Sequence, residues 1–194
     1  MSIVFFFVRD HERDLRFFSS EPPRQVEIKR SKSREAWEAA RRKLTLLPQR
    51  TLRQEQAFYR ALKIGEPALR ILHSGRTDEH RVDHKFRFFL QRHRTRRLVY
   101  LIGEAILLPF SALTMPLPGP NLSFYVLALI MITHWQSFRG LKALLGKEHE
   151  FEAAPLLAEW EEAVAGRREE SYPAILDRIE REYGLPGIRK VLWK

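Results

Sequence analysis

Glu104 and His134 are the two residues whose types and spacing suggest chemistry, because they mark a stretch that is otherwise free of charge. Glu104 is the only Asp, Glu, Lys or Arg between Leu98 and Thr133, in a chain that is 30% charged. If the chain reverses about Gly119, Glu104 and His134 lie at the same level, since both are equally far from Gly119 in sequence. In apolar surroundings either group can titrate near neutral pH, as proton relays require. The pair is therefore a candidate proton or ion site, or alternatively two side chains that anchor their arms at a polar interface.

A proline-rich turn provides the reversal. Its prolines remove backbone donors and fix φ, while glycine and asparagine tolerate the conformations that a reversal needs. The turn residues are Pro116, Pro118, Gly119, Pro120 and Asn121. They divide the apolar stretch into two arms and predict a helical hairpin over residues 98–138.

Each arm of the hairpin can be measured against a bilayer. Residues 98–115 correspond to about 27 Å of ideal helix, against a hydrocarbon core of roughly 30 Å. The second arm, residues 122–138, has a polar far end and is the weaker span. Pro109 predicts a kink in the first helix, or its end at Leu108. The hairpin is thus either a membrane-associated element or the buried core of a helical domain.

The basic excess lies entirely in the N-terminal half of the chain. Residues 1–97 contain 24 Lys and Arg and 12 Asp and Glu, a net charge of 24 − 12 = +12 against +10 for the whole chain. By the positive-inside rule, basic flanks place both ends of the hairpin on the cytoplasmic side of a membrane. They also attract anionic lipid, at about 1 kcal/mol per residue. The predicted membrane-surface cluster consists of Arg92, Arg94, Arg96, Arg97, Arg139 and Lys142.

The remaining patterns predict a mainly α-helical protein with a short N-terminal β element and this central, proline-turned apolar hairpin. The β element pairs residues 3–8 with residues 25–29, which carry β-branched and aromatic side chains. Helices are expected over residues 33–46, 52–62, 67–73, 78–97, 153–165 and 173–183. Three regions follow: a basic region 1–97, the apolar hairpin 98–138, and C-terminal amphipathic helices 139–194.

Other constellations give weaker signals. His80 and His84 have the i, i+4 spacing of a zinc pair, but neither a third ligand nor a catalytic glutamate accompanies them. The glutamates between residues 148 and 162 fit a solvent-exposed face better than a pair of catalytic carboxylates. The chain has no cysteine, no phosphate-binding loop and no nucleophile with a recognisable base. We therefore expect no enzymatic activity, no metal site and no cofactor.

The hairpin turn resembles that of a known family. Residues 108–125 read Leu-Pro-Phe-Ser-Ala-Leu-Thr-Met-Pro-Leu-Pro-Gly-Pro-Asn-Leu-Ser-Phe-Tyr, and Thr133-His-Trp135 and Arg139-Gly140 follow. This pattern is similar to that of the mitochondrial K+-H+ exchange-related protein family and its bacterial relatives. The resemblance implies a membrane-linked role in potassium and proton homeostasis, with K+ and H+ as the ions concerned.

One hairpin cannot enclose an ion site, which transporters build from several helices. We therefore expect an accessory role, exercised through a homo-oligomer or a larger membrane partner and in contact with anionic membrane lipid. The N-terminus lacks the Arg- and Ser-rich character of a mitochondrial presequence. This favours a bacterial inner membrane with both termini on the cytoplasmic side, or the mitochondrial inner membrane if the source is eukaryotic.

Two alternatives belong to other functional classes. The first is a soluble helical interaction or scaffold module that hides the hairpin in its core. The second is a nucleic-acid-binding protein, because arginines are interleaved with aromatic residues such as Phe17, Phe86, Phe88 and Phe89. Nucleic-acid binding is the weaker alternative, since no helix-turn-helix or RNA-binding signature appears and the apolar hairpin would stay unexplained.

Overall fold

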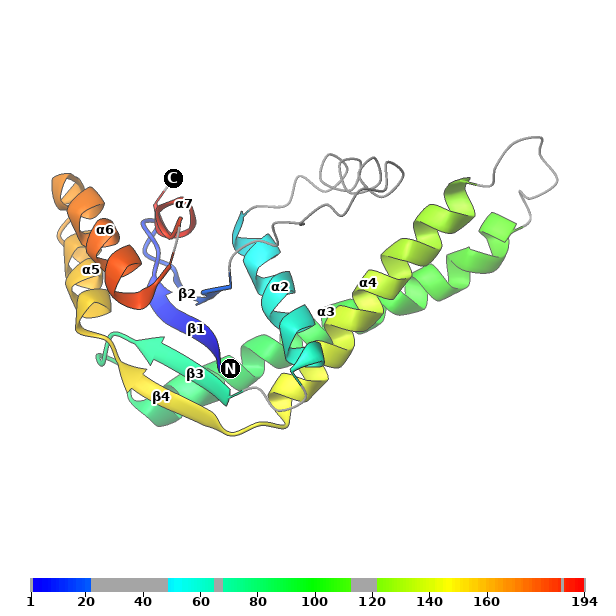
Figure 1. Ribbon diagram of the computed structural model, residues 1–194, viewed down its shortest axis with the longest axis horizontal. Coiled ribbons are helices and arrows are strands. Elements are labelled where there is room, and N and C mark those ends of the chain that lie inside the picture. Colours follow the sequence, from blue (N-terminus) through cyan, green and yellow to red (C-terminus); the bar gives the residue numbers. More distant parts are fainter. Residues whose placement is uncertain (1, 22–48, 65–67, 113–121, 186, 194) are drawn as a thin grey trace.

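The computed structural model describes residues 2–21, 49–64, 68–112, 122–185 and 187–193. Helices make up most of these residues, and a small four-stranded sheet accompanies them (Figure 1). The prediction of a mainly α-helical protein with a short β element is therefore confirmed. The proline turn and the expected helix over residues 33–46 lie outside the described residues.

The sheet has the strand order β2-β1-β3-β4. β2 is antiparallel to β1, whereas β1, β3 and β4 run parallel to one another. The strands are β1 (Ser2–Arg9), β2 (Leu15–Ser19), β3 (Ala68–His73) and β4 (His149–Ala153). β1 pairs with β2 and with β3, and the predicted partner, residues 25–29, lies outside the described residues. The sheet thus joins strands from both the N-terminal and the C-terminal regions of the chain.

β1 explains why the N-terminus is almost continuously apolar. Its side chains alternate between two hydrophobic clusters: Ile3, Phe5 and Phe7 belong to one, and Phe6 and Val8 to the other. All five are buried. A strand buried on both faces has no position for a polar side chain, as is usual for parallel sheets covered by helices on both sides.

β3 corrects the prediction of a helix over residues 67–73. Leu69 and Ile71 point into one cluster and Leu72 into the other, so the segment has the period of two that defines a strand. Leucine, alanine and arginine all have good helix propensity, and for this reason the local sequence predicts a helix. The hydrogen bonds that β3 forms with β1 on one side and β4 on the other, together with burial on both faces, override that propensity.

Helices cover both faces of the sheet. One face packs against α2 (Gln49–Lys63), α3 (Glu79–Ala112) and α4 (Leu122–Leu145). The other face packs against α5 (Pro155–Ala165), α6 (Tyr172–Tyr183) and α7 (Arg189–Leu192), with the short 3-10 helix η1 (Glu169–Ser171) between α5 and α6. The two predicted C-terminal helices correspond to α5 and α6. α6 ends at Tyr183 and is capped by Gly184, whose φ of 63° suits glycine.

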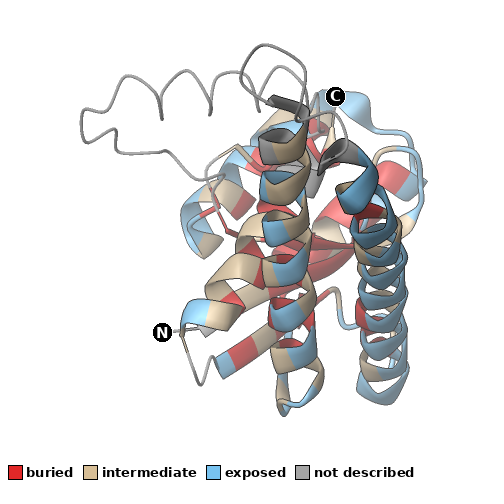
Figure 2. Ribbon diagram, turned by 90° about the vertical axis from the view of Figure 1, so that its right-hand side faces the viewer, coloured by how far each residue is buried: buried red, intermediate tan, exposed pale blue. Residues whose placement is uncertain are grey.

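The α3–α4 pair forms the predicted hairpin and extends away from the sheet (Figure 1). α3 is one helix from Glu79 to Ala112, so it does not end at Leu108 and instead includes Pro109. Buried positions gather around the sheet, whereas exposed positions run along both hairpin helices (Figure 2). Ile102, Ile106 and Phe110 are 53%, 58% and 62% exposed. The outer hairpin is therefore not the core of a helical domain, because the two clusters beside the sheet form the core.

The expectation that the hairpin arms span a bilayer is not supported. Within the ranges described, none of the helices combines the length and the apolar character needed to cross a membrane. The physical reason lies in the helix composition: α3 is strongly basic before residue 98, and α4 becomes polar from His134 onward.

Candidate functional site

The hairpin brings Glu104 and His134 together. Glu104 Oε1 lies 2.5 Å from His134 Nδ1, and the two side chains come from α3 and α4 respectively. Glu104 is only 9% exposed, and its second oxygen, Oε2, is buried without a hydrogen-bond partner among the described residues. The Tyr100 ring lies 5.4 Å from the His134 ring, centroid to centroid. The two residues thus lie opposite each other, as their equal distances from the turn predict. A role in ion or proton movement stays a prediction.

A shallow, open hollow exposes this pair to the outside. Its volume is about 330 Å³, and it is lined by Val99, Tyr100, Gly103, Glu104, Leu107 and His134. The lining combines an acid, an imidazole and a phenol with apolar side chains. Such a hollow can hold a water molecule or exchange a proton with solvent, but its lining does not enclose an ion.

A second polar contact holds the base of the hairpin. Glu55 of α2 forms an ion pair with Arg97 of α3 and accepts a hydrogen bond of 2.6 Å from the Ser137 hydroxyl of α4. Burial lowers the pKa of Arg97, and the neighbouring Tyr100 and Glu104 oppose that shift. Arg97 was predicted to lie on a membrane surface. The structure instead places it between three helices, where Glu55 compensates its charge.

The other members of the basic cluster are exposed but face different neighbours. Arg94 lies over the Phe138 ring, 5.6 Å from its centroid, and Arg139 and Lys142 follow on α4. Arg92 and Arg96 line a separate pocket on α3. The cluster therefore does not form one continuous surface, since its members occupy different sides of the hairpin base.

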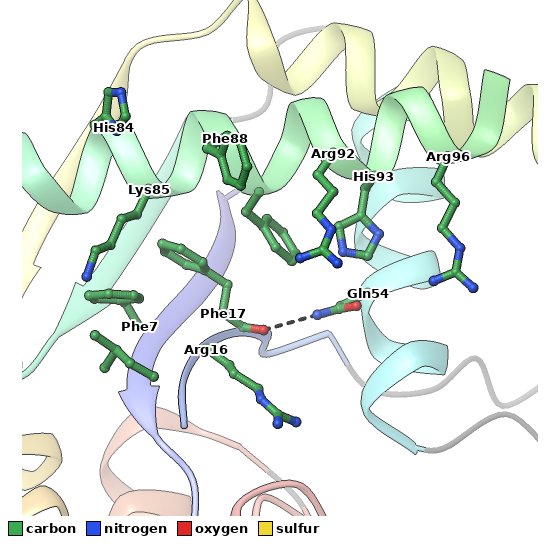
Figure 3. A pocket seen from close by; sticks show the side chains of 12 residues that line it. Phe7, Arg16, Phe17, Gln54, His84, Lys85, Phe88, Arg92, His93 and Arg96 are labelled. Carbon is green, nitrogen blue, oxygen red and sulfur yellow. Dashed lines mark hydrogen bonds between the residues drawn. The ribbon is translucent and has the colours of Figure 1, made fainter. Parts of the chain in front are cut away.

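The pocket on α3 is larger than the hollow beside Glu104 and was not predicted from the sequence (Figure 3). Its volume is about 720 Å³, and it lies between β1, β2, α2 and α3. Aromatic rings form part of its lining: Phe7, Phe17, Phe88 and Phe89. Cationic side chains form another part: Arg16, Lys85, Arg92 and Arg96. The remaining lining residues are Leu15, Gln54, His84 and His93.

Electrostatics make the pocket attractive to anions. None of the described residues that line it is acidic. Arg16 is compensated by Asp14 and by the nearby Asp10 and Glu12, and the Asp14 contact raises its pKa. Burial lowers the pKa of His93, and the positive charges of Arg96 and Arg92 lower it further. The excess positive charge therefore comes from α3 rather than from β2.

One sequence signal could have revealed this pocket. Residues 85, 88, 92 and 96 follow one another at helical spacings of three and four, with Phe89 next to Phe88, and the set combines basic with aromatic side chains. The nucleic-acid alternative rests on the same mixture of residue types but does not assign it to one face of a helix. The contributions of Phe7 and Phe17 depend on the sheet, and local spacing cannot predict them.

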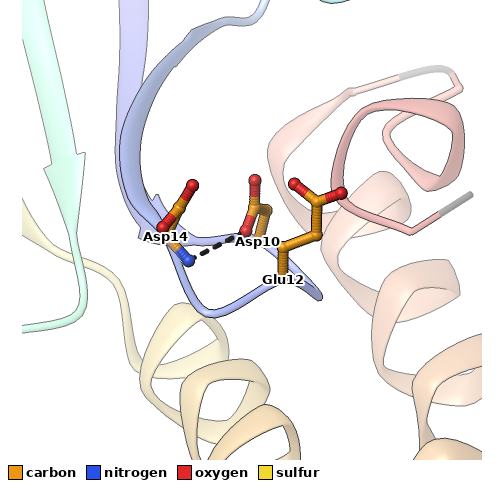
Figure 4. Close-up of side chains that lie close together, drawn as sticks. All are labelled: Asp10, Glu12 and Asp14. Atoms are coloured by element: carbon orange, nitrogen blue, oxygen red, sulfur yellow. Dashed lines mark hydrogen bonds between the residues drawn. The ribbon is translucent and has the colours of Figure 1, made fainter.

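The residues whose types would suit a metal ion lie in a turn and on a helix surface. Asp10, Glu12 and Asp14 gather in the turn between β1 and β2 (Figure 4). Asp10 Oδ1 accepts a hydrogen bond of 3.0 Å from the Asp14 backbone N–H, and Arg16 forms ion pairs with all three carboxylates. His80 and His84 are exposed on α3, and among the described residues no third ligand lies near them. The acidic cluster therefore stabilises a turn, and the two histidines cover a helix surface.

A comparison of the chain with protein-family models, curated proteins and solved structures found no match.

Proposed function

We propose that this protein associates with anionic membranes by laying the outer part of the α3–α4 hairpin in the lipid interface. The exposed apolar side chains of the hairpin carry this proposal. They are Leu98, Val99, Tyr100, Ile102, Ile106, Leu107 and Phe110 on α3, and Leu129, Ile130, Ile132 and Trp135 on α4. Patches of this kind are rare on soluble monomers and mark sites of contact with proteins or lipid.

The charge at the base of the hairpin supports lipid as the partner. Arg92, Arg94, Arg96 and Arg139 are exposed where the apolar surface ends. An apolar surface bordered by basic side chains is typical of helices that lie in the interface. The acyl chains contact the apolar surface, and the acidic headgroups pair with the basic side chains. Trp135 is half exposed and of a type that prefers this zone.

We also propose that the protein is accessory to K+/H+ exchange and cation homeostasis. The resemblance of the turn to the K+-H+ exchange-related family supports this role. The Glu104–His134 contact supports it too, because the pair sits beneath the surface that would meet the lipid. The hairpin alone encloses no ion path, so the role requires a homo-oligomer or a larger partner.

Flotation with vesicles tests the membrane proposal. We expect the protein to float with vesicles of phosphatidylcholine containing phosphatidylglycerol, and a variant with Ile102→Ser, Ile106→Ser and Phe110→Ser to stay unbound. Each buried aliphatic or aromatic side chain contributes about 1.5 kcal/mol or more, so the triple variant should lose at least about a hundredfold in partition coefficient. Ala105→Ser, an exposed position on the same helix, is the matched control and should bind normally. Unchanged binding of the triple variant, or no binding of the unaltered protein, would contradict the proposal.

Potassium-driven proton movement tests the role in exchange. Inverted membrane vesicles from cells that express the protein are challenged with K+, and a pH-sensitive dye reports the internal pH. We expect Glu104→Gln and His134→Ala to abolish the pH-dependent part of this response. Glu150→Gln, which alters an exposed glutamate of β4, is the control and should leave it unchanged. A response that is the same with and without Glu104 and His134 would exclude a proton role for the pair.

A further inference from the structure

We propose that the pocket between β1, β2, α2 and α3 binds an acidic phospholipid, with the phosphate headgroup at its basic rim and an acyl chain over its phenylalanine side chains. This inference rests on the proposed function, because it specifies which lipid the membrane-associated protein would hold. It adds a defined binding site, distinct from the general attraction of a basic surface to a membrane.

The basic rim supplies the contacts that a phosphate needs. Lys85, Arg92 and Arg96 extend from α3 toward the side of β1 and α2 (Figure 3). All three are exposed, and the pocket lining described here contains no carboxylate that could compensate them. Arginine presents paired N–H donors that match phosphate oxygens. The rim therefore favours a phosphate group over a neutral or cationic headgroup.

The aromatic lining favours an acyl chain over a nucleic-acid base. Phe7 and Phe17 stack on each other with centroids 4.5 Å apart, and Phe17 also lies 5.3 Å from Phe89. Phe7 and Phe17 are only 2% and 5% exposed, so neither has a free face on which a base could stack. Phe88, in contrast, is 62% exposed and extends the apolar lining outward.

One face of α3 connects the pocket to the hairpin surface. The pocket residues Lys85, Phe88, Arg92 and Arg96 continue, at the same helical spacing, into Val99, Gly103 and Leu107, which line the hollow beside Glu104. Arg96 Nε donates a hydrogen bond of 2.8 Å to the Tyr100 hydroxyl where the two sites meet. With the hairpin in the interface, a lipid can reach the pocket without leaving the membrane.

Binding of short-chain lipids to the full-length protein tests the pocket without a membrane. Dihexanoyl phosphatidylglycerol is titrated below its micelle concentration and followed by calorimetry. We expect it to bind at one site, while dihexanoyl phosphatidylcholine, with the same chains, does not. Inorganic phosphate, which lacks the chains, should bind more than about tenfold more weakly because it makes no use of the phenylalanines. Equal binding of inorganic phosphate would show an anion site instead and overturn the lipid assignment.

Two double variants distinguish lipid binding in the pocket from general electrostatic attraction to a basic protein. Arg92→Gln with Arg96→Gln removes two rim contacts and should weaken dihexanoyl phosphatidylglycerol binding about thirtyfold. Arg81→Gln with Arg87→Gln removes the same charge from the same helix outside the pocket, and binding should stay within about twofold. Equal losses in both double variants, or no binding to the unaltered protein, would overturn the pocket.

The experiments distinguish an error in the pocket proposal from an error in the membrane proposal. If the pocket is wrong, vesicle flotation still depends on Ile102, Ile106 and Phe110, while short-chain lipid binding is absent or insensitive to Arg92 and Arg96. If membrane association is wrong, vesicles do not bind, yet the short-chain lipid does.

Discussion

The contacts and pKa shifts of the ionisable residues in the hairpin and the pocket depend on their neighbours more than on their residue types. Arg97 and Arg96 are adjacent in sequence, yet Arg97 pairs with Glu55 between helices while Arg96 faces the open pocket. His93, one turn earlier on α3, lies among aromatic rings. Its ring contacts Phe58 of α2 and Phe89, at centroid distances of 5.9 and 4.5 Å. Burial among these rings, with Arg96 and Arg92 nearby, lowers its pKa.

The lowered pKa of His93 predicts that stability falls in mild acid. The unfolded chain takes up a proton at His93 near pH 6.5, whereas the folded protein resists protonation until a lower pH. The stabilising contribution is therefore complete above about pH 6.5 and is lost as the pH falls through the lower, folded-state pKa. Urea unfolding at pH 7, 6 and 5 should show a shallower decline for His93→Gln than for the unaltered protein.

His80→Gln provides the control for this measurement, because His80 is exposed on the same helix. Its decline between pH 7 and pH 5 should match that of the unaltered protein. If His93→Gln declined just as steeply, another group would be responsible for the acid sensitivity.

The packing of α2 against α4 depends on Gly140. A Cβ atom at this position would overlap the carbonyl group of Phe58, a backbone group that cannot move aside independently. The close approach lets Glu55 of α2 reach both Arg97 and Ser137. One glycine thus sets the distance between two helices and, through it, the polar contact at the base of the hairpin.

Adding a methyl group at Gly140 should therefore loosen this packing. Gly140→Ala is expected to lower the free energy of unfolding by about 1–3 kcal/mol, as overpacked positions do. Gly103→Ala is the matched control, because a Cβ at Gly103 meets no atom within 4 Å. The control should be neutral or raise stability by up to about 1 kcal/mol, since alanine is the better helix former. Urea unfolding measures both, and equal effects of the two substitutions would contradict the close approach.

The whole molecule consists of a sheet covered by helices on both faces and a hairpin that extends from one layer. Both hydrophobic clusters lie against the sheet and, among the α4 side chains that the structure describes, include only Leu141, Leu144 and the partly buried Leu145. The outer hairpin residues belong to neither cluster. Stability and membrane association should therefore reside in different parts of the chain.

Shortening the hairpin tests this separation. Residues 101–135 are replaced by a short glycine-serine linker, which is feasible because Arg97 and Ser137 both contact Glu55 and so lie close together. We expect cooperative thermal unfolding to be retained, solubility to rise and flotation with vesicles to be lost. Loss of cooperative unfolding in circular dichroism would show that the outer hairpin contributes to the core.

Local patterns predicted the elements that carry their own signals. The helices expected over residues 78–97 and 173–183 correspond to the first part of α3 and to α6. β3 was missed because its leucines and alanine suit a helix equally well, and only pairing with β1 and β4 makes it a strand. β4 was missed because its exposed glutamates concealed a five-residue edge strand.

The sequence by itself determined which residues could meet inside the hairpin, because equal distances from one turn fix the register of two antiparallel helices. Glu104 and His134 are that case. Only the tertiary structure decided that Arg97 is partly buried against Glu55, that Arg92 and Arg96 line a pocket, and that Phe7 and Phe17 complete it. These contacts join residues far apart in the chain, and they form because the sheet and the close approach at Gly140 bring separate elements together.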